Sequence, residues 1–197
     1  MIEDHRQPVV ALLGNPNSGK SSLFNYLTGM RQKVSNFPGV TVDKKVGLLK
    51  VENKCVSIID FPGTYSTFPN SLDERIVTNA LTNIHDVNYP DLVVYVADAT
   101  QLERHLLLAT QVHDLGIPMI FVLNMVDIIE KDDTKIDVAM LSSFLGCKVV
   151  PISVREGKNV DLVKSAILES LSDYQNIDIK PLFKLDKVEQ DVSQELM

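Results

Sequence analysis

The chain has 197 residues, 45% of them hydrophobic, which suits one globular domain with a substantial core and leaves room for a fragment of a second. A net charge of −7 without any run of more than two basic residues argues against a broad nucleic-acid-binding surface. No signal-peptide core follows Met1, and no apolar run approaches the ~20 residues of a membrane helix. The widely spaced Cys55 and Cys147 indicate buried thiols of a reducing cytosol rather than a disulfide.

The first half of the chain predicts a strand, a glycine-rich loop and a helix, followed by two paired strands. Residues 9–13 are a short apolar run, and the helix after the loop ends at Gly29. Residues 30–40 have the composition of a loop. The runs 41–51 and 55–59 are separated by a two-residue turn, so we expect them to pair antiparallel.

The second half alternates helices with short apolar strands. Strands are predicted at 92–97, 118–123 and 148–152. The helices are expected to begin at capping residues, and two of them to end at glycines: Ser71 with Glu74 to about His85, Thr100 with Glu103 to Gly116, Thr134 with Asp137 to Gly146, and Asn159 onward.

This alternation predicts an α/β fold with a doubly wound, mostly parallel six-stranded sheet and one antiparallel edge strand. Ligands of such sheets bind over the carboxyl ends of the strands. We expect residues 1–172 to form this domain. Residues 173–197 are expected to be a linker and the truncated start of a helical domain, and the alternative is an ordinary C-terminal helix packed on the sheet.

A phosphate-binding motif lies between the first strand and the first helix. Residues 14–22 fit G-x-x-x-x-G-K-[ST], with Gly14, Gly19, Lys20 and Ser21 at the fixed positions. Glycines let successive backbone N–H groups point inward, and the helix N-terminus and Lys20 add positive charge. The Ser21 hydroxyl is suited to a Mg²⁺ ion that bridges the outer phosphates.

Three further segments follow later strands and should therefore lie at the same edge of the sheet. Asp60 and Gly63 form a D-x-x-G sequence suited to Mg²⁺ and the γ-phosphate. Asn124 and Asp127 form an N-x-x-D sequence, in which the carboxylate can accept both N–H donors of guanine, a pair that adenine lacks. The loop 153–155 could add a backbone N–H for the guanine oxygen.

The chain resembles GTP-binding domains, and most closely the N-terminal cytosolic G domain of the FeoB family of bacterial ferrous-iron transporters. The resemblance covers about residues 6–172. Besides the phosphate motif, it rests on five segments: residues 36–42 (Asn-Phe-Pro-Gly-Val-Thr-Val), 60–66, 98–104, 115–118 and 123–127. It implies a Ras-like P-loop GTPase that converts GTP and water to GDP and phosphate. It also implies a following helical domain and a membrane region that takes up ferrous iron, with the present chain at the cytoplasmic face of the bacterial inner membrane.

The same resemblance implies a role for each matching residue. Catalysis would involve Lys20, Thr41 and Gly63, and Mg²⁺ would be held by Ser21, Thr41 and Asp60. The guanine nucleotide would be bound by Gly14, Asn15, Asn17, Ser18, Gly19, Lys20, Ser21, Ser22, Asn124, Met125, Asp127, Ser153 and Val154. Two residues depart from the small regulatory GTPases: Thr64 replaces the glutamine that orients water, and Met125 replaces a lysine beside the base.

A potassium ion is a further expected cofactor. Residues 34–42 contain no arginine that could neutralise charge between the β- and γ-phosphates. A monovalent cation could take that place, with the Asn17 side-chain carbonyl and the backbone around Ser35 and Phe37 as oxygen ligands. Asparagine at this loop position resembles that of cation-activated GTPases.

Two other functions fit the motifs. The chain could be a slow GTP/GDP switch that presents different surfaces to a helical or membrane partner. It could also be a ribosome- or tRNA-associated GTPase, since those share Gly-x-Pro-Asn-x-Gly-Lys-Ser, although the acidic composition argues against a nucleic-acid partner. The sequence leaves the oligomeric state open.

Overall fold

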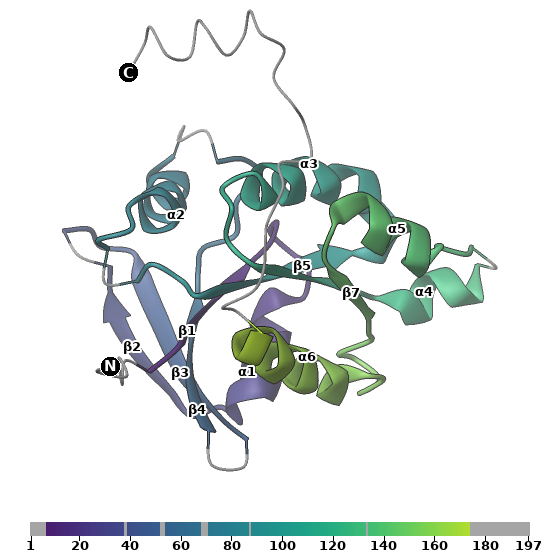
Figure 1. Cartoon of the computed structure of the whole chain (residues 1–197), viewed down its shortest axis with the longest axis horizontal. Helices are drawn as coiled ribbons and strands as arrows, with labels where there is room; N and C mark the ends of the chain where they lie inside the picture. Colours follow the sequence, from purple (N-terminus) through teal and green to yellow (C-terminus); the bar gives the residue numbers. More distant parts are fainter. Residues whose placement is uncertain are drawn as a thin grey trace, which may run out of the picture.

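The computed structural model describes residues 7–37, 39–51, 54–67, 71–86, 88–132 and 134–173 (Figure 1). They form a three-layer α/β fold with a seven-stranded sheet in the middle. The strands are β1 Val9–Leu13, β2 Gln32–Asn36, β3 Asp43–Val51, β4 Lys54–Asp60, β5 Leu92–Asp98, β6 Met119–Asn124 and β7 Lys148–Pro151.

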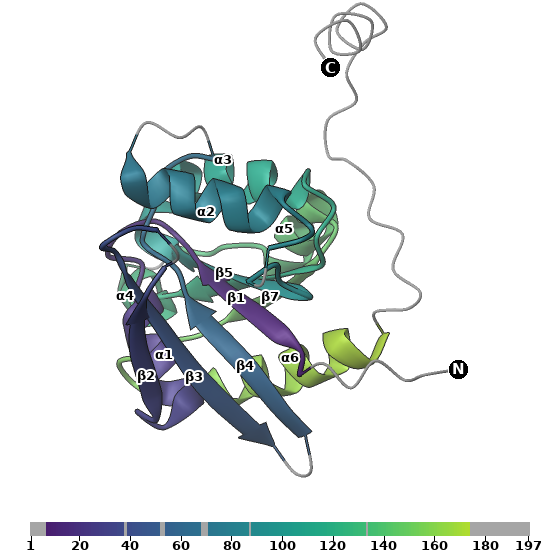
Figure 2. The ribbon, with the colours of Figure 1, turned by 90° about the vertical axis from the view of Figure 1, so that its left-hand side faces the viewer.

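Helices cover both faces of this sheet. They are α1 Lys20–Thr28, α2 Leu72–Thr82, α3 Leu102–His113, α4 Val126–Lys131, α5 Val138–Leu145 and α6 Val160–Asp173, with a 3₁₀ turn, η1, at Ala99–Gln101. Figure 2 shows α2, α3 and α5 above one face of the sheet and α1 and α6 below the other. A separate cluster of buried apolar side chains fills each interface.

The strand order is β2-β3-β4-β1-β5-β6-β7. Strands β4, β1, β5, β6 and β7 run parallel, whereas β3 is antiparallel to both β2 and β4. The predicted doubly wound, mostly parallel sheet is therefore confirmed. Because the five parallel strands point the same way, their carboxyl ends meet at one edge, where we expect the ligand.

The sheet has one strand more than the six predicted. The extra strand, β2, lies within residues 30–40, which were predicted to be a loop. All five β2 residues are exposed, so their sequence has no alternation of apolar and polar side chains that would indicate a strand. Backbone pairing with β3, from Gln32 opposite Gly47 to Asn36 opposite Asp43, forms the strand instead.

The central strands are buried along their whole length. Every residue of β1, β5 and β6 is buried, as the continuous apolar runs predict for strands covered on both faces. Tyr95, Phe24, Phe61 and Phe121 are the largest of the fully buried side chains. This core fixes the strand ends from which the functional loops emerge.

Several local predictions are confirmed and others are wrong. The Ser71–Glu74 capping box is present, with both hydrogen bonds formed. The box predicted at Thr100 is wrong, because the Asp98 carboxylate accepts the Thr100 N–H at 2.8 Å and α3 begins only after a 3₁₀ turn. Asp137 caps α5 without Thr134, whose hydroxyl donates to Asp132 instead.

Two further differences concern short or exposed features. Helix α4 was not predicted, because six residues are too few for a clear helical period. Cys55 is exposed rather than buried, since it lies at the start of β4, before the buried part of the strand. Cys147 is partly buried, and burial raises the pKa of its thiol to about 12.

The described part of the chain ends with α6 at Asp173, one residue past the predicted domain boundary. The linker and further helical domain predicted for 173–197 therefore lie almost entirely outside the described residues. Among the helices that the structure describes, none has the length and apolar character needed to cross a membrane.

Candidate functional site

The phosphate loop, residues 14–19, leaves β1 and enters α1 at Lys20. Gly14 has φ 153°, and a Cβ there would overlap the Val96 carbonyl oxygen of the neighbouring strand. Gly19 has φ 85°, and a Cβ there would overlap the Asn124 side-chain nitrogen. The backbone conformation and the close neighbours thus both require glycine at these two positions.

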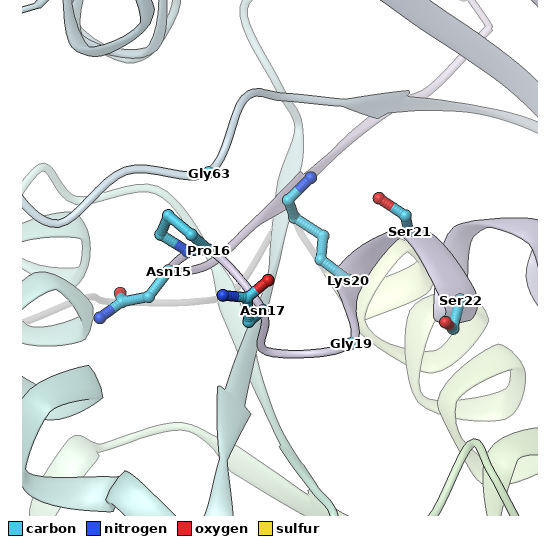
Figure 3. Close-up of a pocket in the computed structure, with 8 residues that line it drawn as sticks. All are labelled: Asn15, Pro16, Asn17, Gly19, Lys20, Ser21, Ser22 and Gly63. Atoms are coloured by element: carbon cyan, nitrogen blue, oxygen red, sulfur yellow. The ribbon is translucent and has the colours of Figure 1, made fainter.

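The loop surrounds a cavity of about 390 Å³, which Figure 3 shows in close-up. In that view the Lys20 ammonium and the Ser21 hydroxyl extend to the same side of the loop. Because α1 begins here, its free N–H groups and the positive end of its dipole also face the cavity. The arrangement suits an anionic, oxygen-rich ligand. The lining residues are Asn15, Pro16, Asn17, Gly19, Lys20, Ser21, Ser22 and Gly63.

A buried ion pair joins two of the predicted motifs. Asp60 ends β4 and pairs in register with Leu12 of β1, so its carboxylate reaches the Lys20 ammonium at the start of α1. Both side chains are less than 10% exposed. The pair therefore places a cation and a hard oxygen ligand together at the phosphate loop, and this combination fits a metal–phosphate ligand.

The segment after Asp60 packs against the loop. A Cβ at Gly63 would lie only 3.0 Å from the Pro16 nitrogen, so the two backbones are nearly in contact. The Thr64 N–H donates to the Gly14 carbonyl at 3.3 Å. The Thr64 hydroxyl is buried and donates to the Ser66 carbonyl at 2.9 Å. It is thus already engaged and does not reproduce the water-orienting role of glutamine.

Asn124 connects two loops. Its side-chain N–H donates to the Ser18 carbonyl at 3.0 Å, and its side-chain oxygen accepts the Val154 N–H at 3.1 Å. Both ends of the amide are therefore used within the protein. Asn124 holds the phosphate loop and the loop after β7 in a fixed relation, a role that the sequence pattern did not reveal.

Asp127 is a buried carboxylate at the same edge of the sheet. Met125, at φ 65°, makes the sharp turn from β6 into α4, whose first turn carries Asp127. The side chain is 4% exposed, and its Oδ2 atom has no hydrogen-bond partner among the described residues. A buried carboxylate oxygen without donors is unfavourable, so this atom is suited to a ligand that brings N–H groups.

In the loop after β7, two of the three backbone N–H groups of residues 153–155 are engaged within the protein. The Ser153 N–H donates to Lys158, and the Val154 N–H donates to Asn124. The next N–H along the chain, that of Arg155, has no acceptor within the described ranges. Arg155 is therefore the better candidate for a backbone contact to a ligand.

Three predicted residues are not brought to the cavity. Thr41 is exposed, Ser35 lies in β2 opposite Lys44, and Phe37 is buried with its ring centroid 5.4 Å from that of Phe61. None of them lines the cavity. Ser35 belongs to the edge strand β2, and Phe37 and Thr41 lie in the connection between β2 and β3.

One residue at the site was missed entirely. Tyr95, which is fully buried in β5, donates its hydroxyl to the Asn15 side-chain oxygen at 2.9 Å. In Figure 3 the Asn15 amide points away from Lys20. Asn15 was predicted to bind the nucleotide, but its side chain is held by the protein. The apolar sequence of β5 gives no sign of this contact.

Comparisons with known proteins agree with this geometry. Residues 8–167 match the FeoB_N family, described as Ferrous iron transport protein B. The Fe(2+) transporter FeoB of Salmonella typhimurium is 46% identical over 162 residues, which make up 80% of this chain and 20% of the relative. The corresponding protein of Escherichia coli K12 is 44% identical over the same length.

The solved structures that the chain resembles are also FeoB proteins. A mutant of S. thermophilus NFeoB bound to mGDP matches with a TM-score of 0.86 and 39% identity, covering 97% of this chain and 71% of that one. The cytosolic domain of T. maritima FeoB in its GMPPNP form matches with a TM-score of 0.86 and 36% identity, covering 95% and 72%.

The present chain spans only about a fifth of the length of its curated relatives. Within that fifth, the family match covers nearly the whole described region, and its sheet edge carries the phosphate loop, Asp60 and Asp127. The chain belongs to the FeoB_N family and corresponds to the G-domain part of ferrous iron transport protein B.

Proposed function

We propose that this chain binds GTP and hydrolyses it to GDP and phosphate in a Mg²⁺-dependent reaction. The observation that carries the proposal is the pairing of a cationic phosphate loop with the buried, partnerless oxygen of Asp127. The relatives named for bound mGDP and GMPPNP support a guanine nucleotide as the ligand. The family assignment replaces the ribosome- or tRNA-associated alternative.

Base recognition follows from the chemistry of Asp127. A carboxylate only accepts hydrogen bonds, and guanine offers a ring N–H and an exocyclic amine side by side. Val154 and Asn124 hold each other, so the neighbouring Arg155 N–H is left for the guanine oxygen. The Met125 methyl group lies 3.9 Å from where a Gly19 Cβ would be, so this side chain lies beside the phosphate loop.

At the phosphate end, Lys20 and the first N–H groups of α1 would hold the β- and γ-phosphates. Ser21 and Asp60 supply the hard oxygen ligands that Mg²⁺ prefers, and Thr41 would join them if its loop closed over the site. A bound Mg²⁺ would neutralise phosphate charge. Gly63, packed on Pro16, would offer its N–H beside the γ-phosphate, and no described side chain yet takes the role of orienting water.

Potassium is proposed as an activating ion at Asn17. This residue is exposed, lines the cavity and has a left-handed backbone with φ 65°. In Figure 3 its amide lies in the middle of the loop, between Pro16 and Lys20. The side-chain oxygen would be one ligand, and the backbone at Ser35 and Phe37 could complete the site only after β2 separates from β3.

The test of this function is GTP hydrolysis measured in KCl and in NaCl at equal ionic strength. We expect faster steady-state phosphate release in KCl. Asn17→Gly should abolish the preference, because it removes the carbonyl while keeping a residue that tolerates φ 65°. Asn17→Ala should also lose the potassium preference. Any further loss of rate relative to Asn17→Gly would measure the backbone strain of a non-glycine residue at this φ. A parent without potassium preference, or an Asn17→Gly variant that retains it, would remove the ion site.

Met125 bears on the choice between this enzyme and the second candidate function, a slow GTP/GDP switch that binds partners, because it affects how firmly GDP is held. A lysine here could lay a charged stem along the base and loop, whereas the methionine provides no hydrogen bond. We therefore expect fast release of GDP without an exchange factor. Met125→Lys should slow it roughly threefold to tenfold, the range that one modest hydrogen bond supports.

Stopped-flow release of a fluorescent GDP analogue measures this effect. Met140→Lys is the matched control, because Met140 is 71% exposed on α5 and the added charge is the same. Equal release rates in Met125→Lys and Met140→Lys would show that Met125 is not the cause.

The role in the whole protein is also a proposal. We infer that the GTP cycle regulates or drives ferrous-iron uptake through a membrane region outside this chain, at the cytoplasmic face of the bacterial inner membrane. Residues 173–197 would begin the helical domain that connects the two. A sequence downstream of Met197 that contains membrane helices would support this, and its absence from the full-length protein would contradict it.

A further inference from the structure

We propose that Tyr95 is a positioning residue for the phosphate loop and that it acts through Asn15. This inference rests on the proposed nucleotide function, because it concerns how the loop is held in shape. It assigns a task to a tyrosine in the middle of an apolar strand that no sequence motif includes.

Tyr95 is a rigid anchor. Its side chain is fully buried, and its ring stacks on Phe121 of the next strand at 5.6 Å with an interplanar angle of 16°. In the sheet it lies directly opposite Leu13, the last residue before the phosphate loop. The hydroxyl group is thus fixed by two strands at the point where the loop begins.

Asn15 receives this anchor inside the loop. It is 3% exposed, its side-chain oxygen accepts from the Tyr95 hydroxyl at 2.9 Å, and its side-chain nitrogen lies 3.5 Å from the Arg104 carbonyl. The Tyr95 hydroxyl also lies 2.9 Å from the His105 carbonyl, so one hydrogen serves two acceptors. Helix α3 and strand β5 therefore hold the same loop side chain.

The anchor supplements two other ties on the loop. Thr64 donates to the Gly14 carbonyl, and Asn124 donates to the Ser18 carbonyl. Between these two ties, the Asn15 side chain is held by Tyr95 of β5 and Arg104 of α3. Asn15 immediately precedes Pro16 and Asn17, whose backbone is left-handed. The directions of the loop N–H groups, which decide phosphate binding, depend on this middle tie.

Loss of the hydroxyl would leave a buried acceptor without its partner. Burial raises the pKa of Tyr95, so the phenol stays protonated and remains a donor at any working pH. Tyr95→Phe keeps the ring and its stacking but removes the donor. The Asn15 amide must then rotate or leave its site, and the loop moves with it.

The experiment measures the dissociation rate of fluorescent GDP from the full chain. Tyr95→Phe should release GDP about tenfold faster, since leaving one buried acceptor unpaired is comparable to a tenfold change in an equilibrium constant. Asn15→Ala should release it similarly. In the Asn15→Ala background, Tyr95→Phe should change the rate by less than about twofold, because the partner is already missing.

Thr110→Val is the matched structural control. It removes another side-chain hydroxyl of the same region, which donates to the Leu107 carbonyl at 2.9 Å within α3 and does not contact the phosphate loop. We expect it to lower the melting temperature while GDP release stays parental, so a general loss of stability would not imitate the positioning effect.

The outcomes separate the two proposals. A parent that does not bind GDP would overturn the proposed function. A parent that binds, with parental release in Tyr95→Phe, would overturn the positioning role, as would accelerations that multiply in the double variant. If Tyr95→Phe fails to fold in thermal melts, Asn15→Ala decides alone, and parental release from that variant would also overturn it.

Discussion

Asp127→Asn is expected to lower GTP affinity by on the order of 100-fold or more and to raise affinity for xanthosine triphosphate. The buried Asp127 oxygen without a partner would accept hydrogen bonds from both guanine N–H groups. Each charge-assisted bond contributes about 1.5–3 kcal/mol, so losing two reaches that magnitude. An asparagine can donate to the extra carbonyl of xanthine, which the carboxylate cannot do.

Competitive titration with GDP, xanthosine diphosphate and ADP measures the change. Asp132→Asn is the matched control, because it removes the same charge from an exposed residue at the end of the same helix. We expect it to bind GDP like the parent. Unchanged GDP binding by Asp127→Asn would remove the base-recognition role of this residue.

Gly19→Ala is expected to lower nucleotide affinity by at least about 100-fold. The added Cβ would overlap the Asn124 side-chain nitrogen, which holds the Ser18 carbonyl, at a backbone position with φ 85°. The loop must shift, and the tie between loop and base site must break. Backbone strain alone accounts for only ~1–2 kcal/mol of this loss.

Gly116→Ala separates strain from overlap. Gly116 has φ 75° at the end of α3, and nothing lies within 4 Å of a Cβ there. We expect this variant to be less stable in thermal unfolding but to bind GDP normally. If both variants bind GDP equally well, or lose binding equally, the overlap with Asn124 is not what requires glycine at position 19.

The sequence predicts the fold well where burial dictates the pattern. The apolar runs of β1, β5 and β6 are covered on both faces, so their strands could be recognised directly. Strand β2 could not be, because its five residues are exposed and only its pairing with β3 makes it a strand. The start of α3 was misjudged because the Asp98 carboxylate competes for the Thr100 N–H.

The candidate site likewise has a part that the sequence predicts and a part that it does not. The phosphate loop, Asp60 and Asp127 carry local motifs, and the structure brings them to one edge of the sheet. The contacts that hold them are long-range: Tyr95 bonds Asn15 across 80 residues, and Asn124 bonds Ser18 across 106. No local pattern encodes such pairs. The placement of Thr41 also depends on long-range pairing, because Thr41 lies in the connection between β2 and β3.

The most direct test of Mg²⁺-dependent GTP hydrolysis is phosphate release by the 197-residue chain with GTP and with ATP, each with Mg²⁺ in KCl and with EDTA. We expect release from GTP that stops in EDTA, and release from ATP that is at least about 100-fold slower at subsaturating nucleotide, because adenine lacks the donor pair for Asp127. Equal rates with both nucleotides, or no release from GTP under any of these conditions, would contradict this expectation.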